Sequence, residues 1–150
     1  MATLYKHLQS KGYNRVRLTP INTNHFLLEA FINDICGVFI LDTGASATCV
    51  DLEHTKYFHL HSQPSTEKAS SASSVEMHTE MATNNMIRIG KWVAKNKSVV
   101  LFDMKAVNEA LKLQENDPVH GIVGADVLKS GQAIIDYKNN WLYLKNKTAP

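Results

Sequence analysis

The sequence predicts an all-β domain with one or two short helices. The first half of the chain consists of short apolar or alternating runs, which are typical of strands rather than helices. The 150 residues suffice for one domain with a substantial core, so we expect residues 1–150 to form a single unit. A composition of 44% hydrophobic and 20% charged residues excludes a chain that stays disordered.

The clearest hairpin lies in the first third of the chain. Residues 26–32 and 35–41 are two strand-length apolar runs, and Asn33 and Asp34 between them tolerate the positive φ of a tight turn. The second run is apolar on both faces, which predicts a central strand. Residues 13–18 alternate apolar and basic side chains and predict an earlier strand.

The middle of the chain changes character twice. Residues 59–74 are rich in Ser, Thr, His and Gln and predict a surface loop. Residues 75–81 alternate and predict a strand with one wet face, and residues 86–89 and 99–102 predict further short strands. Gly90 and the pair Asn96-Lys97 are expected to interrupt these strands.

The C-terminal third contains the predicted helices. Asp103 can cap a helix in which Met104, Val107 and Leu111 recur at helical spacing, and Pro118 follows its end. Residues 125–129 predict a second, shorter helix. Residues 132–137 and 141–145 then predict a closing hairpin, whereas residues 1–20 are expected to be an N-terminal arm or extension.

One motif contains a candidate catalytic residue. Asp42, Thr43 and Gly44 follow the apolar run 35–41 and precede a second apolar run, so an acid is held at a tight turn between two core strands. The tripeptide alone occurs by chance in about one chain in fifteen of this length. Its context adds specificity, because Gly121-Ile122-Val123-Gly124 follows about eighty residues later and opens a predicted helix.

These two motifs, in this order, resemble the retropepsin-like family of aspartic peptidases. The similarity extends from about residue 25 to 144, and the extra helix predicted at 103–114 resembles cellular, bacterial-type members more than viral proteases. The resemblance implies a closed β-barrel with one half-site per chain. It also implies that Asp42 is the catalytic acid, that Thr43 supports the loop by hydrogen bonding across a dimer, and that Gly44 permits the turn.

The resemblance further implies a flap that closes over an extended polypeptide substrate. Its tip is expected in the serine-rich segment, which contains no glycine, unlike the usual flap of the family. The residues expected to contact substrate are Ala45, Ala69, Ser70, Ser71, Ala72 and Ser73. The mechanism requires neither a cofactor nor a metal.

The chain contains only half of the implied site. Hydrolysis by this route needs two carboxyl groups that share one proton and activate a water between them. No other Asp in the sequence is followed by Ser or Thr and then Gly. We therefore expect a two-fold homodimer that brings together one Asp42 from each copy, and endopeptidase activity.

Three alternatives stay open. The chain could be a catalytically inactive module that keeps the fold for peptide binding or dimerisation. His59 and His61, with His54 nearby, raise the possibility of a metal hydrolase, although no Cys or carboxylate at the spacing of a known site completes the ligand set. Cys49 could be a nucleophile, but its strand setting favours a core thiol.

Charge and cysteine content bear on partners and location. Sixteen Lys and Arg against 14 Asp and Glu give a net charge of +2, which predicts neither a nucleic-acid nor a membrane partner. The first residues lack the apolar stretch of a signal peptide, and no run of about 20 apolar residues occurs. We expect a cytoplasmic protein in which Cys36 and Cys49 are reduced.

Overall fold

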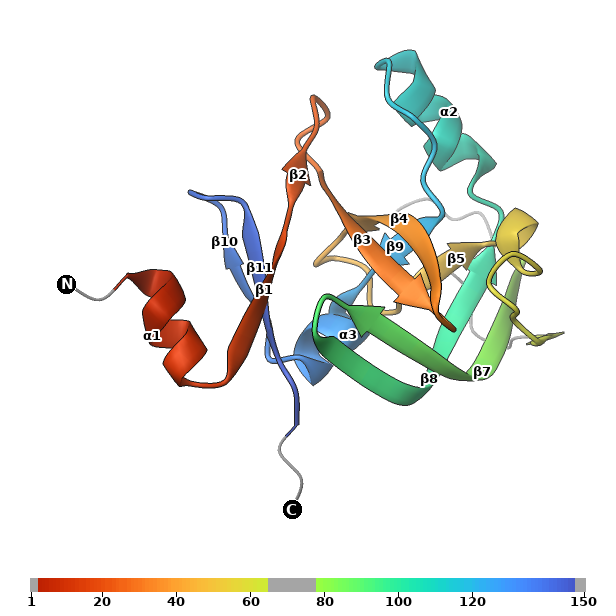
Figure 1. Ribbon diagram of the computed structural model, residues 1–150. Helices are drawn as coiled ribbons and strands as arrows, with labels where there is room; N and C mark the ends of the chain where they lie inside the picture. Colours follow the sequence, from red (N-terminus) through yellow and green to blue (C-terminus); the bar gives the residue numbers. More distant parts are fainter. Residues whose placement is uncertain (1–2, 65–77, 148–150) are drawn as a thin grey trace.

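A computed structural model describes residues 3–64 and 78–147, and Figure 1 shows the course of the chain. The described residues form three α-helices, one 3-10 helix and eleven strands. In chain order these are α1 Leu4–Ser10, β1 Tyr13–Arg17, β2 Thr19–Pro20, β3 Phe26–Ile32, β4 Ile35–Leu41, β5 Cys49–Asp51, η1 Leu52–His54, β6 Ser62–Pro64, β7 Thr79–Ile89, β8 Trp92–Phe102, α2 Lys105–Leu113, β9 Gly121–Val123, α3 Ala125–Ser130, β10 Ile134–Asp136 and β11 Trp141–Lys145.

Six strands close into a barrel. They are hydrogen-bonded in the order β3-β4-β9-β5-β8-β7, and β7 also pairs with β3, where Phe31 lies opposite Arg88. β2 and β6 extend the sheet beyond this ring. The closed, all-β barrel expected from the sequence is therefore confirmed.

The β3–β4 hairpin forms where the sequence predicts it. Asn33 and Asp34 have φ angles of 53° and 67°, which side chains such as Asn and Asp tolerate in a two-residue turn. In β3, the residues at alternate positions from Phe26 to Ile32 are buried in the main core. β4 lies between β3 and β9, as expected of a strand that is apolar on both faces.

β7 and β8 are longer than predicted. Each spans eleven residues, and the two form one hairpin that turns at Gly90. Asn84 and Asn96 adopt positive φ, and the pairing shifts register on either side of Asn85. The expectation of separate short strands ended by Asn96-Lys97 was wrong. Register shifts in the pairing between β7 and β8 accommodate the polar residues, so both strands continue past them.

The chain termini form a second sheet on one side of the barrel (Figure 1). Its strand order is β1-β11-β10, with Tyr13 opposite Lys145 and Arg17 opposite Trp141. The N-terminal helix α1 was not predicted. Its first turn is capped by the Thr3 hydroxyl, which accepts a hydrogen bond from the Lys6 N–H at 3.1 Å.

α2 and α3 appear where the sequence predicts helices. Met104 is the N-cap residue of α2, and the neighbouring Asp103 carboxylate accepts a hydrogen bond from the Lys105 N–H at 2.9 Å. Met104 and Leu111 are buried. In residues 3–64 and 78–147, no helix has the length and hydropathy needed to cross a bilayer.

Candidate active site

Three strand ends hold the loop that carries Asp42. β4 and β9 run parallel, with Leu41 beside Val123, and β5 pairs with the other side of β9. The Asp42 N–H donates to the Val123 carbonyl at 3.0 Å. β4 leads into the loop 42–48 and β5 follows it. Because the short strand β9 pairs with both β4 and β5, it holds both ends of the loop.

The carboxylate of Asp42 is oriented by the turn that follows it. The Gly44 N–H donates to Asp42 Oδ1 at 2.9 Å, and the Ala45 N–H donates to the Asp42 carbonyl at 3.2 Å. A Cβ atom at Gly44 would lie 3.3 Å from Asp42 Oδ1. Among the described glycines, positive φ occurs at Gly12 and Gly90 but not at Gly44. Gly44 is therefore favoured by the close approach of the carboxylate rather than by a left-handed backbone.

A second acid, Asp126, connects this loop to helix α3. Its Oδ1 accepts hydrogen bonds from the Thr48 hydroxyl at 2.7 Å and from the Thr48 N–H at 3.0 Å. The same Thr48 hydroxyl accepts a hydrogen bond from the buried Gly124 N–H at 3.0 Å. Asp126 lies within the helix that the sequence predicts at 125–129, but sequence reasoning selected neither Asp126 nor Thr48 as a site residue. No pattern within the chain signals a pair that is 78 residues apart.

Gly124 allows the two sequence motifs to touch. A Cβ atom on Gly124 would lie 2.7 Å from the Ala47 carbonyl oxygen and 2.8 Å from that of Ala45. The next residue, Ala125, donates its N–H to the Ala45 carbonyl at 2.7 Å. The loop that begins at Asp42 thus packs directly against the backbone at the start of α3.

A buried apolar cluster lies beside the end of β4 that leads to Asp42. Side chains alternate along a strand, so Asp42 projects from the same face of the sheet as Ile40. Ile40 lies beside Ile122, and Ile122 lies opposite Cys49. The three residues belong to one apolar cluster, which also contains Met104 and, from α2, Val107 and Leu111.

The Cys49 thiol stays protonated in this environment. Burial raises its pKa to about 12, and the charges of Asp126 and Asp42 act in the same direction. Its Sγ lies 3.2 Å from the Ala47 carbonyl oxygen, to which it donates a hydrogen bond. A nucleophile must be a thiolate, so the environment of Cys49 supports the core thiol and argues against a catalytic cysteine.

The described residues of the predicted site lie together. Asp42, Thr43, Gly44 and Ala45 form one continuous turn, in which Ala45 is half-buried. Thr43 is exposed and lines a hollow of about 340 Å³ next to α3 and β10. The expected flap residues lie outside the described residues: Ala69, Ser70, Ser71, Ala72 and Ser73.

His54 and His120 form a second polar cluster at the opposite end of β9. Their ring centroids are 4.7 Å apart, and the Tyr57 ring stacks on His120 at 5.4 Å. The ring Nδ1 of His120 accepts a hydrogen bond from the Val38 backbone N–H at 3.0 Å, and the backbone N–H of His120 donates to the Val38 carbonyl at 2.8 Å. In the described part of the chain, no group of three His, Cys, Asp or Glu side chains is arranged to hold a metal.

The surroundings of His120 favour its neutral form. Burial lowers its pKa, and the neighbouring His54 lowers it further, whereas the buried Asp51 carboxylate acts in the opposite direction. The hydrogen bond from Val38 also needs a free lone pair on Nδ1. The neutral imidazole ring of His120 therefore accepts the hydrogen bond from Val38 and links β4 to the start of β9.

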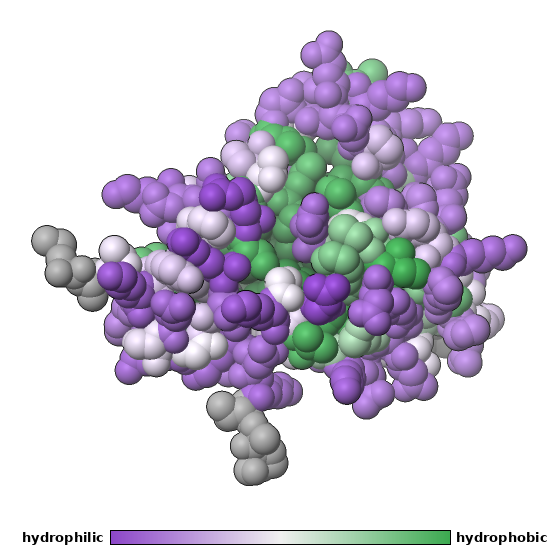
Figure 2. Space-filling model, viewed as in Figure 1, coloured by the Kyte–Doolittle hydropathy of each residue, from purple (hydrophilic) through white to green (hydrophobic). Residues whose placement is uncertain are grey.

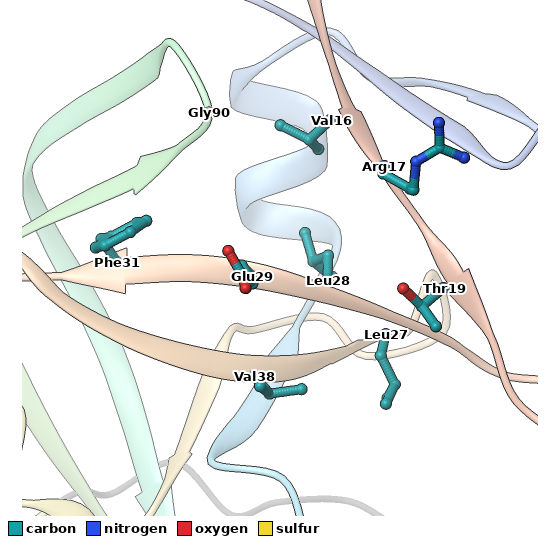
Figure 3. A pocket seen from close by; sticks show the side chains of 9 residues that line it. All are labelled: Val16, Arg17, Thr19, Leu27, Leu28, Glu29, Phe31, Val38 and Gly90. Atoms are coloured by element: carbon teal, nitrogen blue, oxygen red, sulfur yellow. The ribbon is translucent and has the colours of Figure 1, made fainter.

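A hollow of about 560 Å³ lies away from Asp42 (Figure 3). Glu29 is its only carboxylate, and Figure 3 shows the Arg17 guanidinium well apart from it. No residue expected in the site lines this hollow, which therefore offers no paired acids. Its lining residues are Val16, Arg17, Thr19, Leu27, Leu28, Glu29, Phe31, Val38 and Gly90.

The sequence matches a family model described as aspartyl protease over residues 28–127, which spans both motifs. The chain belongs to the aspartyl protease family. No curated protein sequence matches this chain.

Solved structures of retropepsin-like proteases share its fold. A retropepsin-like aspartic protease from Rickettsia conorii is 17% identical, with 88% of this chain and 90% of that chain covered and a TM-score of 0.58. The EIAV protease, solved with the inhibitor HBY-793, is 18% identical, with coverages of 79% and 98% and a TM-score of 0.58. The retroviral protease-like domain of Ddi1 from Leishmania major is 15% identical, with coverages of 83% and 90% and a TM-score of 0.54. The retropepsin-like fold expected from the two motifs is therefore confirmed.

Proposed function

We propose that this chain is a homodimeric aspartic endopeptidase whose catalytic centre contains one Asp42 from each copy. The observation that carries the proposal is the Asp42 carboxylate, held by the Gly44 N–H at 2.9 Å at the end of β4 and β9. The sequence contains one such motif, so a second copy supplies the partner acid. In this proposal residues 1–150 act as one unit, without a cofactor or metal.

The two carboxyl groups would divide the work of hydrolysis. The ionised Asp42 takes a proton from a water molecule, whose oxygen attacks the peptide carbonyl carbon, while the protonated Asp42 gives its proton to the carbonyl oxygen. In the tetrahedral intermediate the Asp42 that took the water proton gives it to the amide nitrogen, the other Asp42 takes a proton back from a hydroxyl group of the intermediate, and the C–N bond breaks. Two like charges at close range cannot both ionise readily, so the pair holds one proton between its members.

The exposed surface beside Asp42 suits contact with a second copy. Thr43 and Ile135 border the same hollow, and Tyr137, which follows β10 in the chain, is 72% exposed. Among the described strands, β10 pairs with β11 alone, which leaves its other edge free for a strand of the partner. A two-fold contact here would bury this edge and place Thr43 near the partner loop.

The substrate would be an extended polypeptide. Ile122 is half-buried on the face that carries Asp42, so it would offer an apolar contact to a substrate side chain next to the cleaved bond. Cys36 and Cys49 are both free thiols, which supports a reducing, cytoplasmic setting.

Cleavage of an unfolded protein by the wild type and by Asp42→Asn tests the proposal. Asp34→Asn is the matched control, because it makes the same charge change in an exposed turn at the far end of β4. We expect Asp42→Asn to be inactive and Asp34→Asn to be active. Equal activity of Asp42→Asn and wild type would eliminate the catalytic role. A folded dimer without activity in any variant would instead favour the inactive peptide-binding module.

A further inference from the structure

Although the net charge is only +2, the basic and acidic residues are distributed unevenly along the chain. Three segments, residues 1–28, 86–102 and 137–150, contain eleven of the sixteen Lys and Arg residues. The same segments contain none of the fourteen Asp and Glu residues. A sum over the sequence cannot show whether these segments meet in the fold.

The structure brings the three segments together. β1 from the first segment pairs with β11 from the third, with Tyr13 opposite Lys145. The side chain of Asn146 accepts a hydrogen bond from the Val93 N–H and donates one to the Lys91 carbonyl, both at 3.0 Å. The end of β11 is thereby fixed beside the turn between β7 and β8, so strands from all three segments adjoin one another on this part of the surface.

One end of this surface carries stacked flat groups. The Arg15 guanidinium lies 3.6 Å from the centre of the Tyr5 ring and 3.8 Å from that of Trp141. The Arg17 guanidinium lies 4.3 Å from the centre of the Trp141 ring. Tyr5, Arg15 and Trp141 are half-buried, and Arg17 is exposed. Aromatic rings and guanidinium planes are the groups on which unpaired bases stack.

The other end is a lysine-lined hollow of about 280 Å³ between β8, α3 and the end of β11. Lys95, Lys97 and Lys147 line it, and Lys97 Nζ donates to the Ser130 hydroxyl at 3.3 Å. No acidic residue lines this hollow, and none of its three lysines forms an ion pair with a carboxylate of the described residues. Its ammonium groups are free to bind an anion.

We propose that this surface, the basic strip, binds single-stranded nucleic acid, with phosphates on its lysines and bases against its stacked end. The strip consists of Tyr5, Arg15, Arg17, Trp141, Lys145, Lys147, Lys91, Lys95 and Lys97. Figure 2 shows mainly hydrophilic residues on the side of the molecule that carries α1 and β1. A bilayer would require several projecting apolar side chains, whereas only Leu4 and Val93 are large, apolar and exposed on α1, β1, β8 and β11.

Fluorescence anisotropy with a labelled oligouridine 12-mer tests the proposal at several salt concentrations. If about four phosphates are neutralised, log K falls against log salt with a slope of about −3. The double variant Lys95→Gln/Lys147→Gln removes two contacts, so we expect a slope shallower by about 1.4 and an affinity roughly 10- to 30-fold lower at 0.1 M salt.

The matched control is Lys105→Gln/Lys112→Gln, which removes the same charge from exposed positions of α2. We expect the control to retain wild-type affinity and both variants to retain the wild-type melting temperature. Equal loss in the two variants, absence of binding at 50 mM salt, or tighter binding to phosphatidylserine vesicles or polyglutamate than to the oligonucleotide would overturn the proposal. Asp42→Asn should bind as the wild type does, so the outcome is independent of peptidase activity.

Discussion

Thr48→Val is expected to destabilise the fold more than its small change in shape suggests. The Thr48 side chain is 1% exposed, and valine has nearly the same shape without the hydroxyl group. The variant removes the 2.7 Å bond to the Asp126 carboxylate and leaves the buried Gly124 N–H without its 3.0 Å acceptor. A hydrogen bond to a charged group contributes about 1.5–3 kcal/mol, and an unsatisfied buried donor costs about 1–3 kcal/mol.

These two contributions overlap because they share one hydroxyl group, so we expect the free energy of unfolding to fall by about 3 kcal/mol. For a chain of this size the melting temperature should fall by roughly 6–12 °C. Activity should fall as well, because Thr48 holds the loop that orients Asp42 against α3.

Urea unfolding and thermal melts measure the effect directly. Thr48→Ser is the control, because it retains the hydroxyl group and loses only a methyl group, and we expect it to cost less than about 1.5 kcal/mol. A Thr48→Val protein within about 0.5 kcal/mol of the wild type would refute the reasoning. So would a serine variant that is as unstable as the valine variant.

Three further predictions concern the same elements. The pKa of His120 is lowered from 6.5, so as pH falls the unfolded state binds a proton at this residue before the folded state does. The free energy of unfolding should therefore decrease as pH falls through about 6.5 and should level off below the folded pKa. Urea titrations should show a weaker pH dependence for His120→Gln, and an unchanged profile would contradict this. Gly124→Ala should lower the free energy of unfolding by more than about 2 kcal/mol and abolish peptidase activity, because the added Cβ would meet two backbone carbonyl oxygens; a melting temperature equal to that of the wild type would contradict it. With a pKa of about 12, the Cys49 thiol should react with a chromogenic disulfide at pH 8 much more slowly than the half-buried Cys36, and equal rates in a stopped-flow assay would contradict this.

The barrel and the Asp42 loop were predictable because their signals are local. The turn at Asn33 and Asp34, the alternation in β3 and the apolar runs before Asp42 each specify backbone geometry within a few residues. The strand ends at Leu41 and Val123 meet because two apolar strands of one sheet place their ends at the same edge. Sequence reasoning could therefore predict that Asp42 follows a core strand and begins a tight turn.

The remaining features depend on residues that are distant in the sequence. Asn96 and Lys97 were expected to interrupt a strand, but cross-strand pairing keeps β8 continuous through them. In the sequence, Thr48 looks like an ordinary strand residue and Asp126 like a residue at the start of a helix. Only the fold brings the Thr48 hydroxyl within 2.7 Å of Asp126 Oδ1. α1 is too short for its periodicity to identify it, and it is stabilised by the burial of Leu8.

The shared active site can be tested most directly by mixing subunits. Wild-type and Asp42→Asn chains, combined at constant total concentration and allowed to exchange, form a heterodimer with a single carboxyl group at its centre. If each active site requires two copies of Asp42, activity follows the square of the wild-type fraction and is about one quarter at equal amounts. Activity that falls in direct proportion to the wild-type fraction, to about one half, would show that one chain suffices and would contradict the account.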